Sequence, residues 1–529
     1  MKILVADRIS STGIDYLKQQ NGLEVIEQYE ASPEERISQV QGIDALIVRS
    51  ATEVTAAIIN AARNLRVIGR AGVGVDNIDL EAATEKGIIV LNTPTGNTIA
   101  TAELTFTHIM CSARLLPQAN QSMKAGEWDK KSFSGNELRG KVLGVIGAGR
   151  IGAEVAKRAQ SFEMDVLAYD PFLTKTRASA IGVTMVSLDD LFKNADYITV
   201  HVPLTEDSQY LLDESAFAKM KKGVRVFNCA RGGIIKESAL IQAVKSGKVA
   251  AAGLDVFENE PLSKDSELRN LPNVVLTPHL GASTKEAQES VGLEVAEAIT
   301  SVLRGGMIRN ALNMPSIDLK TLETLRPYLS LGERLGHMLQ QMTGKDIEQL
   351  KVTYWGKLTE MDLLPLTRAI QRGYLKNICG EYINDVNAPA KFKQLGISLK
   401  VTNSSDEADF TDLIRVEAID ENGKTWSLEG TLIGKQHNPR VVHMNGYELE
   451  FRPDGHLLLI GNKDVPGVVG MVGSILGMDG VNIANMALSR CENDGLAMTV
   501  FELDTELSDK AFRELAENAG IVLVQMIKL

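Results

Sequence analysis

The segment Val142–Gly152, which reads VLGVIGAGRIG, constrains the fold of this chain more than any other. A GxGxxG run follows an apolar strand directly and opens the helical window 153–161. Gly147 permits a tight turn, Gly149 lets the backbone approach a pyrophosphate, and Gly152 lets a helix pack closely on the strand. The amino end of that helix adds partial positive charge. The segment therefore predicts a parallel α/β sheet that binds a dinucleotide.

Asp170 indicates which dinucleotide. It follows the strand-like run Val166–Tyr169, eighteen residues beyond Gly152. A carboxylate at that place accepts hydrogen bonds from the adenosine ribose and repels a 2′-phosphate. A bare glycine motif also fits a flavodoxin-like turn with no ligand, but strand, helix and acid together favour a cofactor. We therefore predict NAD rather than NADP.

Alternating apolar and helical patterns divide the first three hundred residues into two α/β units. This alternation begins at the amino end of the chain and begins again, with clearer apolar runs, at Lys141. Expected strands are 3–6, 45–49, 67–68 and 88–92 in the first unit, and 142–146, 164–169, 197–200, 224–228, 251–254 and 274–277 in the second. Both units are predicted to be doubly wound, Rossmann-like or flavodoxin-like lobes.

The pattern changes after Pro315. A leucine-rich helical stretch precedes strands that look antiparallel, with hairpin signals at Asn422-Gly423 and Asn445-Gly446. These features predict an α+β domain at about 315–452. The last segment has expected strands at 457–461, 483–489, 497–503 and 521–526, helices at 466–476 and 510–518, and a tight turn at 493–495. That order is βαββαβ, the ferredoxin-like pattern.

Charge and cysteine usage exclude several classes of function. The formal charge of −12 disfavours nucleic acid as a partner. The four cysteines show no CxxC spacing, which argues against a metal site or a redox pair and favours a reducing cytoplasm. The start of the chain does not read as a signal sequence. The longest weakly polar stretch, 468–478, is shorter than the roughly 18 residues that span a bilayer, so we expect no membrane segment.

A dehydrogenase that acts on an alcohol needs a base for the hydroxyl proton, and histidine has a suitable pKa. Among the seven histidines, His279 and His201 each follow or end an apolar strand, where α/β sheets hold their ligands. His108 lies in a helical window and is expected to be packed. Position alone leaves His279 and His201 as contenders.

Two nearby runs favour His279. Asn228–Gly233 places Arg231 at a strand end, which suits a bidentate grip on a carboxylate, although a surface ion pair is the alternative. Asp255–Pro261 offers carboxylates after another strand, and one of them could hold the imidazole. An ordinary acidic loop is the commoner outcome for such a run.

These motifs, together with Pro278–Ser283, resemble the signature set of the D-isomer-specific 2-hydroxyacid dehydrogenases. Ile47–Thr52 and Gly69–Asn77 resemble the branch of that family that acts on 3-phosphoglycerate, and the likeness spans the whole chain. The resemblance implies NAD-dependent oxidation of 3-phospho-D-glycerate to 3-phosphohydroxypyruvate for L-serine synthesis. The alternatives are a glyoxylate or hydroxypyruvate reductase, and an NAD-sensing regulator that acts by binding partners.

The resemblance also implies roles for single residues. His279 would be the acid/base, Glu260 its partner and Arg231 the grip on the substrate carboxylate. Arg49 and Arg70 would meet the phosphate. The implied cofactor contacts are Gly147, Gly149, Arg150, Ile151, Gly152, Asp170, Cys229, Ala230, Asp255, Gly281 and Ala282, with no metal. Val73 stands where the family often has a hydroxyl residue, so any cofactor bond there would come from backbone.

The same resemblance implies a division into four domains. Residues 1–98 and 283–314 would bind substrate, 99–282 would form the NAD-binding Rossmann domain, 315–452 an intervening domain and 455–529 an ACT regulatory domain. The chain would cross between the first two through helices near 99–120 and 284–304. Asn462, Asp464 and Asn482 would bind L-serine at a domain interface, in a homotetramer.

Overall fold

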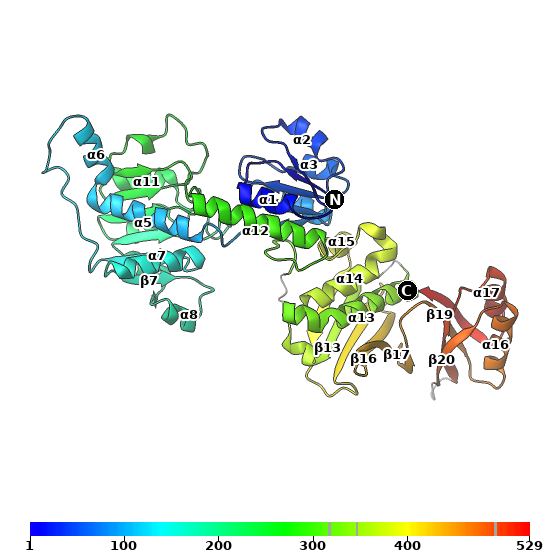
Figure 1. Ribbon diagram of the computed structural model, residues 1–529. Coiled ribbons are helices and arrows are strands. Elements are labelled where there is room, and N and C mark those ends of the chain that lie inside the picture. Colours follow the sequence, from blue (N-terminus) through cyan, green and yellow to red (C-terminus); the bar gives the residue numbers. More distant parts are fainter. Residues whose placement is uncertain (316–318, 345–346, 491–494) are drawn as a thin grey trace.

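The computed structural model describes residues 1–315, 319–344, 347–490 and 495–529. The strands of these residues form four sheets, which follow one another along the chain. Figure 1 shows the first lobe in blue beside the second in cyan and green, with the yellow and the orange-to-red parts continuing from the first lobe. In the described part of the chain, no helix is long and apolar enough to cross a membrane.

The first sheet is parallel and has the order β2-β1-β3-β4-β5, which is the flavodoxin-like order. Its strands are β1 (Lys2–Val5), β2 (Glu24–Glu27), β3 (Ala45–Val48), β4 (Val67–Arg70) and β5 (Ile89–Leu91), and its helices are α1 (Ser11–Lys18), α2 (Pro33–Gln39), α3 (Ala56–Ala61) and α4 (Leu80–Glu85). The buried strands bear out the predicted lobe. The edge strand β2 has exposed glutamates at both ends, and the apolar pattern did not reveal it.

The second sheet is parallel in the order β12-β11-β10-β9-β6-β7-β8, the Rossmann arrangement. Its strands are β6 (Val142–Ile146), β7 (Asp165–Tyr169), β8 (Thr184–Met185), β9 (Tyr197–Val200), β10 (Val224–Asn228), β11 (Val249–Leu254) and β12 (Val274–Leu276). Its helices are α7 (Arg150–Ser161), α8 (Lys175–Ala180), α9 (Leu188–Asn194), α10 (Glu214–Lys219) and α11 (Glu237–Lys245), with the short η1 (Glu267–Asn270). The sheet order reverses between β6 and β9, directly beside the glycine-rich turn.

Two long helices exchange the chain between the lobes. α5 (Thr98–Arg114), followed by α6 (Leu116–Lys124), packs on α7, β10 and β11 of the second lobe. α12 (Lys285–Leu303) returns and packs on α1 and β4 of the first lobe. The return is tight, because a Cβ on Gly13 would lie 2.4 Å from the carbonyl oxygen of Gly292. The chain then pairs with β5 through the Leu91–Ala311 bridge.

The third sheet has the order β14-β13-β15-β16-β17-β18. Its strands are β13 (Gln349–Gly356), β14 (Ser398–Asn403), β15 (Asp412–Ile419), β16 (Thr425–Ile433), β17 (Asn438–Met444) and β18 (Tyr447–Phe451), packed with α13 (Leu319–Thr343), α14 (Leu364–Cys379) and α15 (Ala388–Gln394), with η2 (Lys357–Glu360) and η3 (Gly380–Tyr382) between elements. Asn445 and Gly446 both have positive φ, as the predicted hairpin requires. The expected antiparallel pairing is confirmed for β13 and β15–β18, and β14, a strand that the sequence did not predict, runs parallel to β13 after the α14–α15 crossover.

The fourth sheet is antiparallel in the order β20-β21-β19-β22. Its elements are β19 (His456–Lys463), α16 (Val468–Met478), β20 (Ile483–Arg490), β21 (Leu496–Leu503), α17 (Asp509–Ala516) and β22 (Ile521–Lys528), which confirms βαββαβ. The predicted turn at 493–495 lies partly outside the described residues. One sheet face packs on α16 and α17, whereas Leu457, Leu459 and Val500 on the other face join the core of the third unit.

Candidate active site

The carboxyl ends of β10, β11 and β12 meet at one edge of the second sheet. Asn228, Leu254 and Leu276 lie level in the parallel register. The residues that follow these strands therefore emerge side by side, and they include Arg231, Asp255 and His279. This edge is where open α/β sheets bind their ligands.

His279 and Glu260 are in hydrogen-bond contact, with 2.7 Å between Nδ1 and Oε2. Burial raises the pKa of the Glu260 carboxyl, but the hydrogen bond to His279 and the charges of His279 and Arg231 outweigh burial, so that this pKa lies below its ordinary value. The other carboxylate oxygen accepts the Phe257 N–H at 3.1 Å. Since an ionised carboxylate can only accept, the contact assigns the proton to Nδ1 and leaves Nε2 as the basic nitrogen.

Asp255 holds the loop that carries His279. Its buried carboxylate accepts the Thr277 hydroxyl at 2.5 Å, the Leu280 N–H at 2.7 Å and the Gly281 N–H at 2.8 Å. Its own carbonyl oxygen accepts the His279 N–H at 2.9 Å. His279 adopts φ +55°, which a non-glycine residue tolerates only when its surroundings hold it there. The carboxylate that the resemblance assigned to the cofactor is thus engaged in shaping the loop that carries His279.

Arg231 lies between the two lobes. Its Nε donates to Asp76 Oδ2 of the first lobe at 3.0 Å, and its Nη1 donates to the Ala230 carbonyl at 2.7 Å. Asn228 shapes the turn, since its side chain donates to the Arg231 carbonyl and accepts the Ala230 N–H. The ion pair that the sequence left open as an alternative therefore exists, but it spans the lobes beside the His279–Glu260 pair.

Arg49 and Arg70 bring further positive charge to the same place. Burial lowers the pKa of Arg70 to about 10, and the nearby charges of Arg231 and Arg49 act in the same direction, while Asp76 and Asp7 oppose them. The buried Nε of Arg70 has no hydrogen-bond partner among the described residues. Three guanidinium groups thus gather at the junction of the lobes, which suits a ligand with more than one negative charge.

The loop that carries Arg49 is held by two residues that the sequence reading missed. The Asp7 carboxylate accepts the Arg49 N–H at 2.6 Å, the Thr52 N–H at 3.1 Å and the Thr52 hydroxyl at 2.7 Å. The Asn77 side chain donates to the carbonyl oxygens of Arg49 and Thr52. The available signal was positional, since Asp7 stands two residues after a buried strand, as Asp255 stands directly after another.

The glycine-rich turn has the geometry that a dinucleotide requires. Gly147 has φ +88°, and a Cβ there would lie 2.5 Å from the His201 carbonyl oxygen. A Cβ on Gly152 would lie 2.1 Å from the Gly147 carbonyl oxygen, whereas one on Gly149 would meet nothing within 4 Å. The backbone at Gly149 is therefore open to a phosphate at the amino end of α7, which no side chain caps. These residues fit NAD.

The remaining predicted cofactor residues surround this turn. Asp170 follows β7, and its carboxylate accepts the Ala148 N–H at 3.0 Å and the Phe172 N–H at 2.9 Å, which leaves lone pairs for a ribose. Arg150 is exposed at the start of α7 and Ile151 is half-buried. Cys229 is buried after β10, where burial raises the pKa of its thiol to about 12. Its side chain therefore packs as a neutral thiol, and only its backbone is available to a cofactor. Ala230, Gly281 and Ala282 line the same strand-end edge.

The two other histidines of the second lobe occupy packed positions. His201 lies beneath the glycine-rich turn, its Nε2 is 3.0 Å from the Thr199 hydroxyl, and burial lowers its pKa to about 4. His108 is buried with Nε2 at 3.0 Å from the Thr277 hydroxyl, and burial lowers its pKa. Within the described part of the chain, neither of these histidines is hydrogen-bonded to a carboxylate as His279 is to Glu260, so the geometry separates His279 from His201, as position in the sequence could not.

The predicted effector residues lie at opposite ends of the fourth sheet. Asn462 pairs with Ala497 near the end of β19, and Asp464 follows that strand. Asn482 precedes β20, whose first residue pairs with Leu503, and its side chain donates to Asp504 Oδ2 at 2.8 Å. Since eight strand residues span roughly 25 Å, a single chain does not bring the three side chains together.

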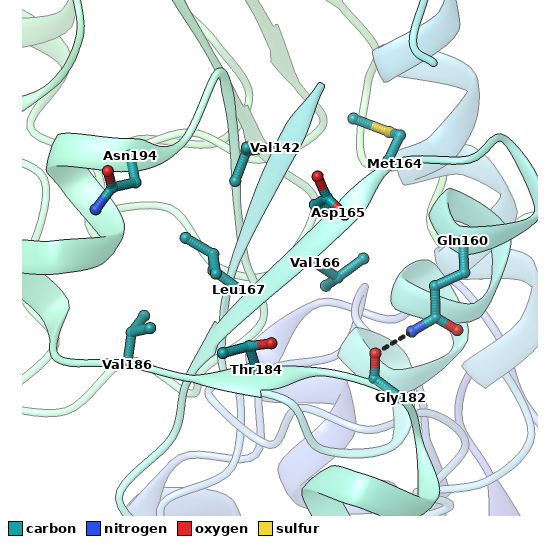
Figure 2. Close-up of a pocket in the computed structure, with 10 residues that line it drawn as sticks. All are labelled: Val142, Gln160, Met164, Asp165, Val166, Leu167, Gly182, Thr184, Val186 and Asn194. Atoms are coloured by element: carbon teal, nitrogen blue, oxygen red, sulfur yellow. Dashed lines mark hydrogen bonds between the residues drawn. The ribbon is translucent and has the colours of Figure 1, made fainter. Parts of the chain in front are cut away.

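A cavity of about 480 Å³ lies elsewhere in the second lobe (Figure 2). It opens at the amino ends of the strands, and Figure 2 shows the Gln160 side chain at its rim donating to the Gly182 carbonyl, at 2.7 Å. Its lining residues are Val142, Gln160, Met164, Asp165, Val166, Leu167, Gly182, Thr184, Val186 and Asn194. Because His279 and Arg231 stand at the carboxyl ends, this cavity is separate from the candidate active site.

Comparison with known proteins agrees with this arrangement. Residues 106–281 match the family model "D-isomer specific 2-hydroxyacid dehydrogenase, NAD binding domain", and residues 324–445 match "D-3-phosphoglycerate dehydrogenase intervening domain". The chain is similar to D-3-phosphoglycerate dehydrogenase of Archaeoglobus fulgidus, with 44% identity over 100% of both chains. It is also similar to D-3-phosphoglycerate dehydrogenase of Bacillus subtilis, with 41% identity over 100% of this chain and 99% of the relative.

Solved structures resemble the first two lobes. D-lactate dehydrogenase of Escherichia coli aligns with a TM-score of 0.53 and 30% identity, over 59% of this chain and 100% of that one. A glyoxylate reductase from Paecilomyes thermophila aligns with a TM-score of 0.55 and 31% identity, over 59% of this chain and 98% of that one.

Proposed function

The chain belongs to the D-3-phosphoglycerate dehydrogenases of the D-isomer-specific 2-hydroxyacid dehydrogenase family, and on that premise we propose that it oxidises 3-phospho-D-glycerate to 3-phosphohydroxypyruvate, the first step of L-serine synthesis. One observation carries the assignment within the molecule. The His279–Glu260 pair stands beside the junction where Arg49, Arg70 and Arg231 gather. A base next to concentrated positive charge suits an anionic hydroxyacid.

Proton transfer is assigned to Nε2 of His279. With Nδ1–H held by Glu260, Nε2 takes the proton of the substrate C2 hydroxyl. The Glu260 carboxylate then stabilises the imidazolium that forms. In the reverse direction the imidazolium returns that proton to the carbonyl oxygen.

The arginines bind and orient the substrate. Arg231 holds the carboxylate next to the reacting carbon, and Arg70 and Arg49 hold the phosphate at the other end. The buried Nε of Arg70, which meets no acceptor among the described residues, supports this assignment, because a buried donor is costly until it finds an acceptor.

The second lobe holds NAD along the glycine-rich turn. Gly147, Gly149 and Gly152 set the backbone, Arg150 and Ile151 meet the pyrophosphate, and Asp170 meets the ribose. When bound, NAD⁺ supplies the acceptor for the hydride that leaves C2. Cys229, Ala230, Gly281 and Ala282 would line the nicotinamide end of the cofactor, and Asp255 holds the His279 loop at the same edge of the sheet.

The C-terminal unit is proposed to sense L-serine. Asn462 and Asp464 lie at one end of its sheet and Asn482 at the other, so a ligand that uses all three requires two copies of the unit side by side. This geometry supports an oligomer, which we propose is a homotetramer. The free thiols of Cys111, Cys229 and Cys379 suit a reducing compartment, and we propose the cytoplasm.

The test is NADH formation from 3-phospho-D-glycerate by the full chain, with and without L-serine. D-glycerate in one direction and glyoxylate and hydroxypyruvate in the other measure the reductase alternative. We expect kcat/KM for the phosphorylated acid to exceed that for D-glycerate by at least about 100-fold, because two arginines lose their ligand in the latter. Higher efficiency on the unphosphorylated acids would favour the reductase. No turnover with retained NAD binding would favour the regulator.

A further inference from the structure

Asp76 is a carboxylate at the candidate site to which neither the motifs nor the proposed chemistry gives a role. It comes from the loop after β4 in the first lobe, and its Oδ2 accepts a hydrogen bond from Arg231 Nε of the second lobe at 3.0 Å. The Asp76 side chain is 73% exposed, whereas that of Arg231 is 26% exposed. The pair thus joins a well-packed cation to an anion that is free to turn into water.

Asp76 occupies the edge of the guanidinium that a substrate carboxylate needs. Nη1 of Arg231 already donates to the Ala230 carbonyl. Nη2 packs against the backbone at Gly74, where a Cβ would lie only 1.7 Å from Nη2 and 2.9 Å from Asp76 Oδ2. A bidentate carboxylate uses two neighbouring nitrogens of the fork, and the edge left for it runs through Nε and Nη2. Asp76 takes the Nε end of that edge.

The charges nearby explain why a carboxylate sits there. Burial, and next the charge of Arg231, lower the pKa of Arg70, and the charge of Asp76 acts in the opposite direction. An exposed ion pair contributes little to stability, so exchanging Asp76 for another carboxylate costs little. The exchange is therefore close to balanced, and a small change at Asp76 shifts it.

We propose that Asp76 is an internal competitor of the substrate carboxylate, which holds Arg231 Nε until the hydroxyacid takes that place. This inference rests on the proposed function, because it assigns Arg231 to the carboxylate of the hydroxyacid. It makes Asp76 a specificity-determining residue, since a ligand must bind Arg231 more strongly than Asp76 does in order to displace it.

The experiment compares Asp76→Asn with the wild type in steady-state oxidation of 3-phospho-D-glycerate. We expect KM to fall by about two- to fivefold, the range that an exposed ion pair supports, with a smaller change in kcat. Two probes separate the ends of the substrate. Inhibition by D-glycerate, which has the carboxylate alone, should strengthen by the same factor, and inhibition by glycerol 3-phosphate, which has the phosphate alone, should not change.

Glu53→Gln is the matched control, because it removes one exposed negative charge from a neighbouring loop of the same lobe. It should leave both inhibition constants unchanged. A higher KM in Asp76→Asn would overturn the proposal, since Asp76 would then position Arg231. Equal gains for both probes, or equal gains in Glu53→Gln, would also overturn it, because net charge alone would explain them.

The outcome also separates this inference from the proposed function. A wild type that oxidises 3-phospho-D-glycerate while Asp76→Asn shows no gain in carboxylate binding contradicts the inference alone. A wild type without that activity contradicts the proposed function, and direct calorimetric titration with D-glycerate and glycerol 3-phosphate then tests the competition at Arg231 by itself. Asp76→Ser serves as a second variant should the asparagine lower the thermal transition.

Discussion

The two lobes hold their site loops with the same device but use them for different chemistry. In the first lobe the Asp7 carboxylate accepts three hydrogen bonds from Arg49 and Thr52. In the second lobe the Asp255 carboxylate accepts three from Thr277, Leu280 and Gly281. Each acid follows a buried parallel strand, and each clamps the loop after a neighbouring strand.

The difference lies in what the clamped loop presents. The clamped loop of the first lobe presents the guanidinium of Arg49, which binds anions and does not exchange protons near neutral pH. The second presents an imidazole with an acidic partner, which does exchange them. The Arg49 loop of the first lobe is thus assigned to substrate binding and the His279 loop of the second lobe to proton transfer, so that changes at the first loop should appear in KM and changes at the second loop in kcat.

The largest effect is expected for His279→Asn. Loss of the base should lower kcat by about 10²- to 10⁴-fold, because the amide cannot accept the hydroxyl proton. NAD affinity, measured by fluorescence titration, should stay within about twofold, since the glycine-rich turn is separate from this side chain. Turnover close to that of the wild type would remove His279 from the role and break the division between the lobes.

Asp255→Asn should have the next largest effect. The amide group would present a donor to at least one of the N–H groups of Leu280 and Gly281, which leaves the His279 loop misaligned. We expect kcat to fall by about 10- to 100-fold with little change in the KM for 3-phospho-D-glycerate. Steady-state kinetics measure both constants, and an effect confined to KM would contradict the division.

Asp7→Asn is the matched substitution in the first lobe. The amide oxygen can still accept the N–H groups of Arg49 and Thr52 and the amide NH₂ can donate to the Thr52 hydroxyl, so the loop loses charge-assisted bonds but no partner. This loop is assigned a binding group rather than the base. KM for 3-phospho-D-glycerate should rise by about fivefold, the equivalent of one weakened hydrogen bond, while kcat changes less. If kcat fell as much as in Asp255→Asn, the lobes would not differ in the way proposed.

The sequence predicts the lobes better than it predicts their junction. Strands buried on both faces, such as β3 and β6, are continuous apolar runs, and their alternation with helices identifies a parallel sheet. The apolar pattern does not reveal the edge strands β2 and β8, because they are short and because β2 also carries glutamates. The parallel pairing of β14 cannot be predicted from composition, because it depends on the crossover through α14 and α15.

The candidate site shows the same limit. Residues within motifs, such as His279 and Asp170, are visible because spacing along one strand and its loop determines their place. Asp76 and Asp7 are single acids whose partners are distant along the chain, 155 residues for Asp76 with Arg231. The loops of the first lobe meet those of the second because the chain crosses between the lobes through α5 and returns through α12. A local sequence pattern does not show which residues far apart along the chain come into contact.

The smallest effect on activity, and the last test of the comparison, concerns acid sensitivity. Residues 1–98 and 283–314 contain no histidine, whereas the second lobe contains the buried His108 and the half-buried His201, whose ring Nδ1 is shielded from solvent. Burial lowers the pKa of His201 to about 4 from its ordinary 6.5. Below about pH 6.5, His201 therefore binds a proton in the unfolded chain but stays neutral in the folded lobe. Stability contributed by the neutral form is complete above pH 6.5 and declines towards pH 4, by about 3 kcal/mol at most.

Hydrogen exchange measures this for each lobe separately. Between pH 7 and pH 5, protection of β6 and β9 should fall after correction for intrinsic rates, while protection of β1 and β3 should hold, since most carboxylates titrate below that window. His201→Gln should flatten the decline without restoring any loss in the first lobe. Equal losses in both lobes would show that acid acts through shared carboxylates, and the histidines would then give the second lobe no separate response to pH.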